Sequence, residues 1–184
     1  SRQLHLASNP GMKKSIIVAA TAFAVAACGQ NNPDLQEKVE SYAVVEVSSP
    51  LYDALSDNDK KIVGLFREAA EIMDGLFWKQ TFGDKAEMEA LTDENEKAYA
   101  MINYGPWDHL DNNEPFVSGY GAKPLGCCYY PQDMTMEEWE AFDDPDKLSL
   151  YTVVRRDENG ALKTVWYRDE YKEELDKVCA LLEE

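Results

Sequence analysis

The chain has 184 residues, with 35 acidic and 18 basic side chains and a formal net charge of −17 at neutral pH. This length suits one ordinary domain, and a hydrophobic fraction of 45% is normal for a chain that buries a core. The charge excludes the commonest nucleic-acid-binding proteins, which present a basic patch, and argues against a polybasic attraction to anionic membranes. The two histidines, His5 and His109, lie too far apart for a His-Glu-x-x-His zinc motif, which has them four positions apart on one helix.

Residues 12–28 have the pattern of a bacterial lipoprotein signal. Met12-Lys13-Lys14 is a short basic region, and Ile16 to Ala27 is an uncharged run of apolar and small residues. That run is too short to span a bilayer, which takes about 20 residues, but it suits a secretory signal. Val25-Ala26-Ala27-Cys28 resembles a lipobox, in which the cysteine becomes acylated after cleavage. An ordinary signal peptide that contains a cysteine is the alternative.

This pattern divides the N-terminal part of the chain and predicts its location. We expect upstream or cloning residues over 1–11, a lipoprotein signal peptide over 12–27, and the lipidated Cys28 with a polar tether over 28–40. Lipidation would place the protein in the bacterial cell envelope, held to the membrane by its acyl chains. Gly29 is not the aspartate that retains enterobacterial lipoproteins at the inner membrane, which favours the outer membrane by analogy.

A long helix is predicted after Ser56, a good N-cap that is followed by acidic residues. Apolar residues recur behind it at helical spacing, which predicts five or six turns with one apolar stripe facing the core. The stripe consists of Ile62, Phe66, Ala69, Met73 and Leu76. Before this helix, residues 42–47 are rich in β-branched side chains and read as a short strand or a helix end.

Two shorter helices are predicted next, one from Asp84 to Leu91 and one capped by Thr92 that runs to about Asn103. The inner face of the second is expected to carry Ala98, Met101 and Ile102. Gly105-Pro106 is the expected stop signal. Residues 105–131 contain eight Gly or Pro residues together with aromatic side chains, which predicts an ordered loop laid over a partner surface.

The C-terminal third is predicted to hold a short helix, a hairpin and a last helix. Thr135 and Glu138 have the spacing of a capping box. Residues 148–156 and 161–168 are β-rich and are joined through Asn159-Gly160, a pair that favours a type I′ turn. A final helix is expected from about Asp169 to Glu184. The fold class predicted for the whole is α+β, mostly helical, with one clear β-hairpin.

No residue type with catalytic or metal-binding chemistry occurs in a convincing pattern. Cys127 and Cys128 are adjacent, whereas zinc sites favour separations of two to four residues, so we interpret these residues and Cys179 as small buried thiols. A disulfide from Cys179 to either neighbour is the alternative in an oxidising compartment. His109 is interpreted as a surface histidine or a hydrogen-bonded loop residue.

The most distinctive stretch is a helix end that turns into a rigid aromatic loop. Such a loop can hold two subdomains together or form the floor of a cleft. From the residues alone, a structural role is favoured over a binding role. Its members are Asn103, Tyr104, Gly105, Pro106, Trp107 and Asp108.

This stretch and several later blocks resemble the bacterial branch of the dipeptidyl-peptidase III family. The later blocks are Pro115-Phe116, Lys123-Pro124-Leu125-Gly126, Tyr130-Pro131, Asp133-Met134-Thr135, Asp143 to Lys147 and Ser149 to Val153. The resemblance covers about residues 41–182. It departs from the family pattern at His109, where arginine is expected, and at Cys127-Cys128, where alanine-asparagine is expected.

The resemblance implies a zinc exopeptidase that removes dipeptides from the N-termini of oligopeptides. The family's zinc is held by a helical His-Glu-x-x-x-His motif and a glutamate of a second helix, and none of these residues occurs here. Residues 41–184 are therefore expected to be the N-terminal part of such a domain, with no catalytic or metal-binding residue of its own. The segment 103–108 is expected to contact substrate or the other lobe. Apolar surface that the remaining part would cover should be exposed.

Two other classes of function remain open from the sequence. One is a non-catalytic acidic envelope lipoprotein that binds peptide or a protein partner. The other is a redox or metal module that uses Cys127, Cys128 and Cys179.

Overall fold

The computed structural model describes residues 32–184. The expected upstream residues, the signal peptide and the lipidation of Cys28 lie outside the described residues. The elements are α1 (Pro33–Glu40), α2 (Pro50–Asp53), α3 (Asp57–Thr81), α4 (Lys85–Glu89), α5 (Glu94–Asn103), β1 (Trp107–Asp108), β2 (Glu114–Pro115), the 3-10 turn η1 (Cys127–Tyr129), α6 (Met136–Ala141), β3 (Thr152–Arg156), β4 (Leu162–Trp166), α7 (Tyr167–Glu170) and α8 (Lys172–Glu183). The predicted class, α+β and mostly helical, is confirmed.

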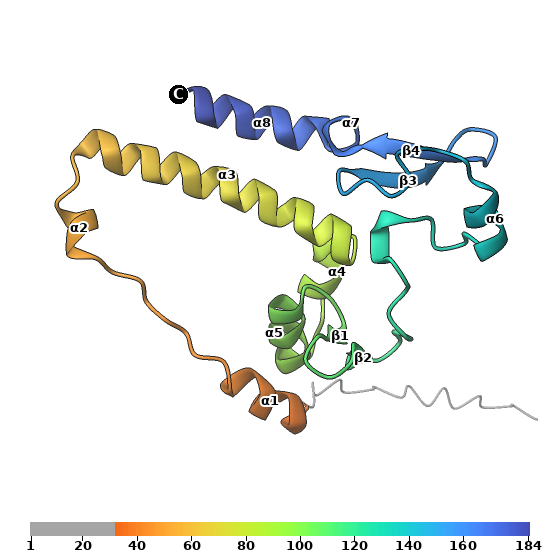
Figure 1. The fold of residues 1–184 in the computed structure, drawn as a ribbon. Helices are drawn as coiled ribbons and strands as arrows, with labels where there is room; N and C mark the ends of the chain where they lie inside the picture. The colour runs from red at the N-terminus through yellow and green to blue at the C-terminus, as the bar shows by residue number, and fades with distance from the viewer. Residues whose placement is uncertain (1–31) are drawn as a thin grey trace, which may run out of the picture.

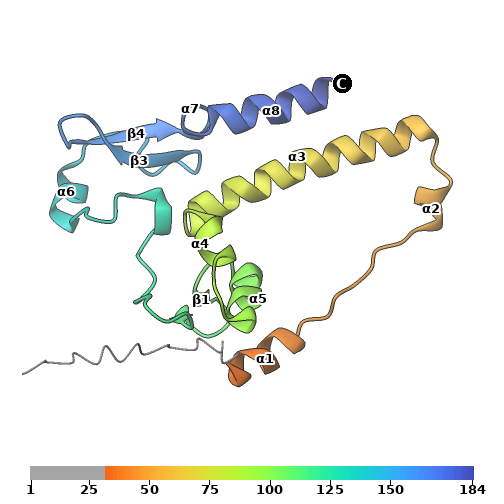
Figure 2. The same cartoon turned by 180° about the vertical axis from the view of Figure 1, so that it is seen from behind.

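The 25-residue helix α3 is the axis of the fold. Ser56 caps it as predicted, because its hydroxyl accepts a hydrogen bond from the Asp59 amide. Helix α8 lies along α3, as Figure 1 and the reverse view in Figure 2 show, and an ion pair joins Lys79 of α3 to Glu174 of α8. At its C-terminal end α3 meets α4 and η1. The layout is therefore open, with α1, α4, α5 and β1–β2 on one side of α3 and α6 to α8 with β3–β4 on the other.

The principal core cluster lies where α3, α4 and α5 meet. Trp78, Met88 and Ala100 are almost completely buried there. The residues packed around them are Phe82, Leu91, Met101, Tyr104, Phe116 and Tyr120. Several come from the loop after α5, so that loop is ordered because its aromatic rings complete this core.

The predicted apolar stripe of α3 is only partly core. Ala69 and Leu76 are buried, but Ile62, Phe66 and Met73 expose 43%, 59% and 45% of their surface. The stripe is continuous, but among residues 32–184 too few side chains face its N-terminal half. The expectation of exposed apolar surface is thus confirmed.

Three helix details differ from the prediction. Asp93, not Thr92, caps α5, since its carboxylate accepts from the Asn95 and Glu96 amides. The buried face of α5 carries Tyr99, Ala100 and Asn103, whereas Ala98, Met101 and Ile102 are half-buried, because α1 and the loop pack on the adjacent face. The expected last helix is divided at Tyr171 into α7 and α8.

The region before α3 also differs from the prediction. The tether expected over 28–40 is a helix from Pro33 onward, capped by the Asn32 side chain and packed on α5. Residues 43–48 are neither strand nor helix in the structure. Within residues 32–184, no helix combines the length and the hydropathy needed to cross a membrane.

The predicted hairpin is present, with Thr152 opposite Trp166 and Arg156 opposite Leu162. Its turn is not the predicted type I′, which needs a positive φ at two successive residues. Gly160 has φ +81°, but Asn159 does not have a positive φ, and the Asp157 amide donates to the Ala161 carbonyl at 2.8 Å. The connection is therefore a three-residue loop with glycine in the left-handed position. The capping box of Thr135 and Glu138 is confirmed, with both reciprocal bonds present.

Candidate functional site

The distinctive segment Asn103–Asp108 begins as α5 ends. Tyr104 has φ 53°, a left-handed C-cap, and Gly105 follows with φ +144°. A Cβ atom at Gly105 would lie 3.4 Å from the Phe82 side chain in an unfavourable backbone conformation. These two residues turn the chain sharply, so that β1 runs back beside the helix that it has just left.

Asp108 is the electrostatic centre of this turn, and only 2% of its surface is exposed. Its Oδ2 atom accepts from Lys38 Nζ at 2.5 Å and from the Tyr99 hydroxyl at 2.9 Å, while Oδ1 accepts from the Leu110 amide at 3.0 Å. Burial by itself would raise the pKa of the Asp108 carboxyl, but these hydrogen bonds outweigh it and hold the pKa below its ordinary value. Asp108 thus joins α1, α5 and the loop through one carboxylate.

The pKa values of the two side chains that donate to Asp108 are raised, whereas the pKa of Asp108 is lowered. The hydrogen bond to the carboxylate raises the pKa of Lys38. Burial, followed by the hydrogen bond to Asp108, raises the pKa of Tyr99 to about 12. Both donors therefore keep their protons at neutral pH, which maintains the cluster.

The other polar groups of the segment also have partners inside the chain. Trp107 Nε1 donates to the Gly121 carbonyl at 2.9 Å, and the Tyr104 hydroxyl donates to Asp74 Oδ1 at 2.5 Å. Asn103 Nδ2 donates to the Tyr99 carbonyl at 3.0 Å. Asn103, Pro106, Trp107 and Asp108 are all buried. The geometry favours the structural role of this segment, and its contact with substrate or another lobe stays a prediction.

His109 is a loop residue beside a lysine, in agreement with its interpretation. Its Nε2 atom lies 2.9 Å from Lys123 Nζ, and burial and this neighbouring ammonium lower the pKa of His109. No three His, Cys, Asp or Glu side chains within residues 32–184 are grouped as metal ligands. Because the described histidine faces a cation, these residues do not fit the zinc ion that the resemblance implies.

All three described cysteines are free thiols. Cys128 is half-buried and donates to the Phe82 carbonyl at 3.1 Å, and burial raises the pKa of its thiol. Cys127 beside it has φ 45°, and Cys179 is exposed on α8. The interpretation as buried thiols therefore holds for the pair in part and is wrong for Cys179, because α8 directs that residue away from α3.

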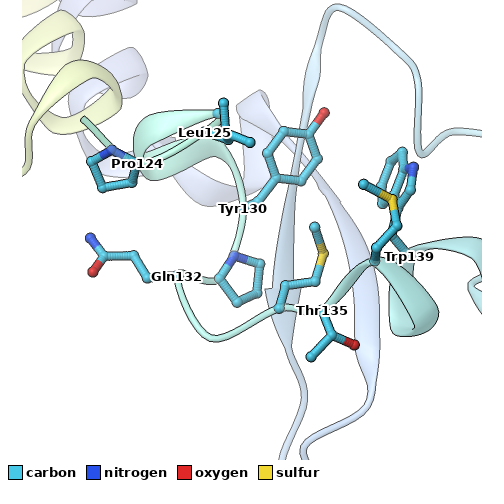
Figure 3. A pocket seen from close by; sticks show the side chains of 10 residues that line it. Pro124, Leu125, Tyr130, Gln132, Thr135 and Trp139 are labelled. Atoms are coloured by element: carbon cyan, nitrogen blue, oxygen red, sulfur yellow. The ribbon is translucent and has the colours of Figure 1, made fainter. Parts of the chain in front are cut away.

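A groove of about 480 Å³ lies between the loop before η1 and helix α6. Figure 3 shows the Tyr130 ring in the middle of this groove, with Leu125 on one side and Trp139 on the other. The Tyr130 and Trp139 rings are 5.4 Å apart and nearly perpendicular. The lining residues are Pro124, Leu125, Gly126, Tyr130, Pro131, Gln132, Met134, Thr135, Met136 and Trp139.

The α6 wall of the groove is fixed to the hairpin by Arg156. This guanidinium donates to both oxygens of Glu138, at 2.9 and 3.0 Å, and also to Asp133. The bidentate pair, with the Thr135 amide, lowers the pKa of Glu138 to about 2. Lys147 lies 4.8 Å over the Trp139 ring and donates to the Phe142 carbonyl. Parts of this region belong to the family blocks, but the sequence did not predict a groove, because the contact that fixes α6, from Arg156 to Glu138, joins residues far apart in the chain.

Comparisons with known proteins show which structures this chain resembles. The chain matches no protein-family profile. Two solved structures match it: dipeptidyl-peptidase III from Caldithrix abyssi, with a TM-score of 0.70 and 30% identity over 80% of this chain, and dipeptidyl-peptidase III from Corallococcus sp. strain EGB, with a TM-score of 0.72 and 29% identity over 82%. A curated relative, Nudix hydrolase 3 from Arabidopsis thaliana, is 28% identical over 57% of this chain.

In each case this chain corresponds to a small part of the other protein. It spans 30% of each solved structure and 18% of the Arabidopsis protein. The likeness in fold and sequence nevertheless covers most of the chain, as the blocks from Asn103 onward predicted. In fold and in sequence, the chain is similar to part of these dipeptidyl-peptidase III structures.

Proposed function

We propose that this chain is the N-terminal segment of a lipid-anchored zinc dipeptidyl peptidase that removes dipeptides from the N-termini of oligopeptides. The observation that carries the proposal is the structural likeness to two dipeptidyl-peptidase III structures, with 29–30% identity over about four fifths of this chain. In this proposal the zinc ligands and the general base come from polypeptide outside residues 1–184. The segment alone is then catalytically incomplete.

The segment would supply part of a lobe rather than the reacting groups. The long helix α3 and the buried carboxylate of Asp108 hold α1, α5 and the following loop in a fixed arrangement. The exposed apolar residues of α3, Ile62 and Phe66 among them, support a further part of the protein that packs against this helix. The groove beside Trp139, with a volume of about 480 Å³ and an aromatic and apolar lining, would suit an extended peptide.

The peptidase proposal is tested by the gene and by an assay. We expect the reading frame to continue after Glu184 into a His-Glu-x-x-x-His helix and a second helix that bears a glutamate. The full frame should release dipeptides from an oligopeptide, as followed by mass spectrometry, and a zinc chelator should abolish release. Residues 28–184 alone should release none. A full frame without dipeptide release would refute the proposal, and peptide binding in the groove would then favour the non-catalytic lipoprotein.

The lipid anchor is tested separately. We propose that Cys28 is acylated and holds the protein at the outer membrane of the cell envelope. The intact protein should partition into detergent, incorporate a labelled fatty acid and fractionate with outer membranes, whereas Cys28→Ser should do none of these. Label that persists in the variant would assign acylation to another residue.

A further inference from the structure

Residues 43–48 form a linking segment between α1 and α2 whose backbone has no hydrogen-bond partner among residues 32–184. Its side chains are exposed to solvent as well. Val44, Val45 and Val47 expose 101%, 75% and 90% of their surface. Figures 1 and 2 show this stretch, in orange, running alone between the two helices, with no helix or strand beside it in either view.

Both ends of the linking segment are held in place. On one side the Lys38–Asp108 pair fixes α1, and the Tyr42 ring packs against the Tyr99 ring at 6.3 Å. On the other side Lys60 Nζ donates to the Asp53 carbonyl at 3.1 Å, which ties α2 to the start of α3. The segment is therefore suspended between two anchored helices, which reduces the conformational entropy lost when it pairs with a partner.

The sequence of the segment suits a strand with one buried face. Side chains alternate between the two faces of a strand, so Ala43, Val45 and Val47 share one face. Val44, Glu46 and Ser48 share the other, which is more polar. An apolar face together with unpaired backbone groups is a template for the addition of another strand.

We propose that residues 43–48 form a β-strand of the assembled protein, paired with a strand of the polypeptide that follows Glu184. This inference rests on the proposed function, since the solved structures extend well beyond the 30% of their length that matches this chain. A second copy of the chain is the less favoured occupant, because each copy carries a net charge of −17 and two such copies repel each other. The described strands β3 and β4 pair with each other on the far side of α3.

Hydrogen exchange followed by mass spectrometry tests the pairing in the full-length protein and in residues 28–184. In the full-length protein, amides of residues 43–48 should exchange at least tenfold more slowly than in the shorter chain, alternate amides for an edge strand and all of them for a central strand. Free exchange in the full-length protein would overturn the inference. So would a reading frame that stops at Glu184, or protection of the shorter chain that grows with its concentration, which would identify a second copy as the occupant.

A pair of variants tests the predicted buried face. Val45→Lys in the full-length protein should abolish the protection, whereas Val44→Lys adds the same charge on the opposite face and should retain it. Equal loss in both variants would overturn the face assignment. The outcomes also separate the two proposals, because protection without dipeptide release refutes only the peptidase, and dipeptide release without protection refutes only the strand.

Discussion

Replacing Asp108 by asparagine should be strongly destabilising, although the two side chains have nearly the same size. Three donors converge on the carboxylate: the Lys38 ammonium, the Tyr99 hydroxyl and the Leu110 amide. An asparagine has one acceptor oxygen, and its NH₂ group would face either the ammonium of Lys38 or the N–H of Leu110. Neither of those groups can accept a hydrogen bond.

The magnitude follows from burial. Asp108 and Tyr99 are each 2% exposed, so a mismatched donor costs about 2 kcal/mol. The Lys38 side chain is 42% exposed and can be rehydrated, so loss of its pairing adds only about 1 kcal/mol. We expect Asp108→Asn to lower the free energy of unfolding by about 3 kcal/mol, or the Tm by roughly 6–12 °C.

The assay is urea denaturation, followed by circular dichroism and tryptophan fluorescence, with two reference variants. Lys38→Met should cost about 1 kcal/mol, because it removes the more exposed partner. Asp176→Asn breaks a pair with Lys172 of similar length, 2.6 Å, in which both side chains are more than 60% exposed, and should change nothing measurable. If Asp108→Asn costs no more than Asp176→Asn, burial is not what gives the Asp108 cluster its strength.

Three further perturbations follow from the described contacts. Gly126→Ala should destabilise by about 2–3 kcal/mol in the same assay, because φ is +72° and the new Cβ would overlap the Tyr130 ring. Gly160→Ala, with φ +81° and open space around it, should cost only about 1 kcal/mol. Equal costs would contradict the contact with Tyr130. The stabilisation from Asp108 should be present above its ordinary pKa of 3.8 and should disappear as pH falls through the lowered pKa of the folded state. The difference in Tm between wild type and Asp108→Asn should therefore shrink below about pH 4. A difference that stayed constant from pH 7 to about pH 2 would contradict the lowered pKa of Asp108. In a Cys28→Ser, Cys127→Ser background, Cys179 should react with a thiol reagent before Cys128, since Cys179 is exposed and the pKa of Cys128 is raised. A fast phase that survives Cys179→Ser in that background would refute this order.

Local signals predicted the elements of this fold well. Ser56, Asp84 and Thr135 each cap the helix that follows them, because a side-chain oxygen next to free amides acts within one turn. The β-rich runs on either side of Asn159-Gly160 likewise predicted the hairpin from local sequence alone. The turn type was missed because only Gly160 adopts a positive φ, and a three-residue loop satisfies the same flanking strands.

The site depends on contacts that local patterns do not contain. Lys38 and Asp108 are 70 positions apart, and nothing near Lys38 indicates that its helix packs on α5. Arg156 and Glu138 are 18 positions apart and together fix the wall of the groove. Each pair joins elements with ordinary surface compositions, so the distinctive segment 103–108 was found from its sequence while its partners were not.

The errors in burial share one physical origin. Periodicity shows which residues of α3 lie on one face, but burial requires a second surface, and within residues 32–184 that surface covers Ala69 and Leu76 without covering Phe66. The valines at positions 44, 45 and 47 also lack a surface that covers them. Their side chains are exposed, and their backbone groups make no hydrogen bond within residues 32–184. The N-terminal half of α3 lies away from the Trp78 core, and residues 43–48 run from α1, beside α5, towards α2 and the start of that helix. One further part of the protein that packed here could both bury the exposed face of α3 and pair with residues 43–48. We therefore expect that the full-length protein either protects residues 43–48 and also buries Phe66, or does neither.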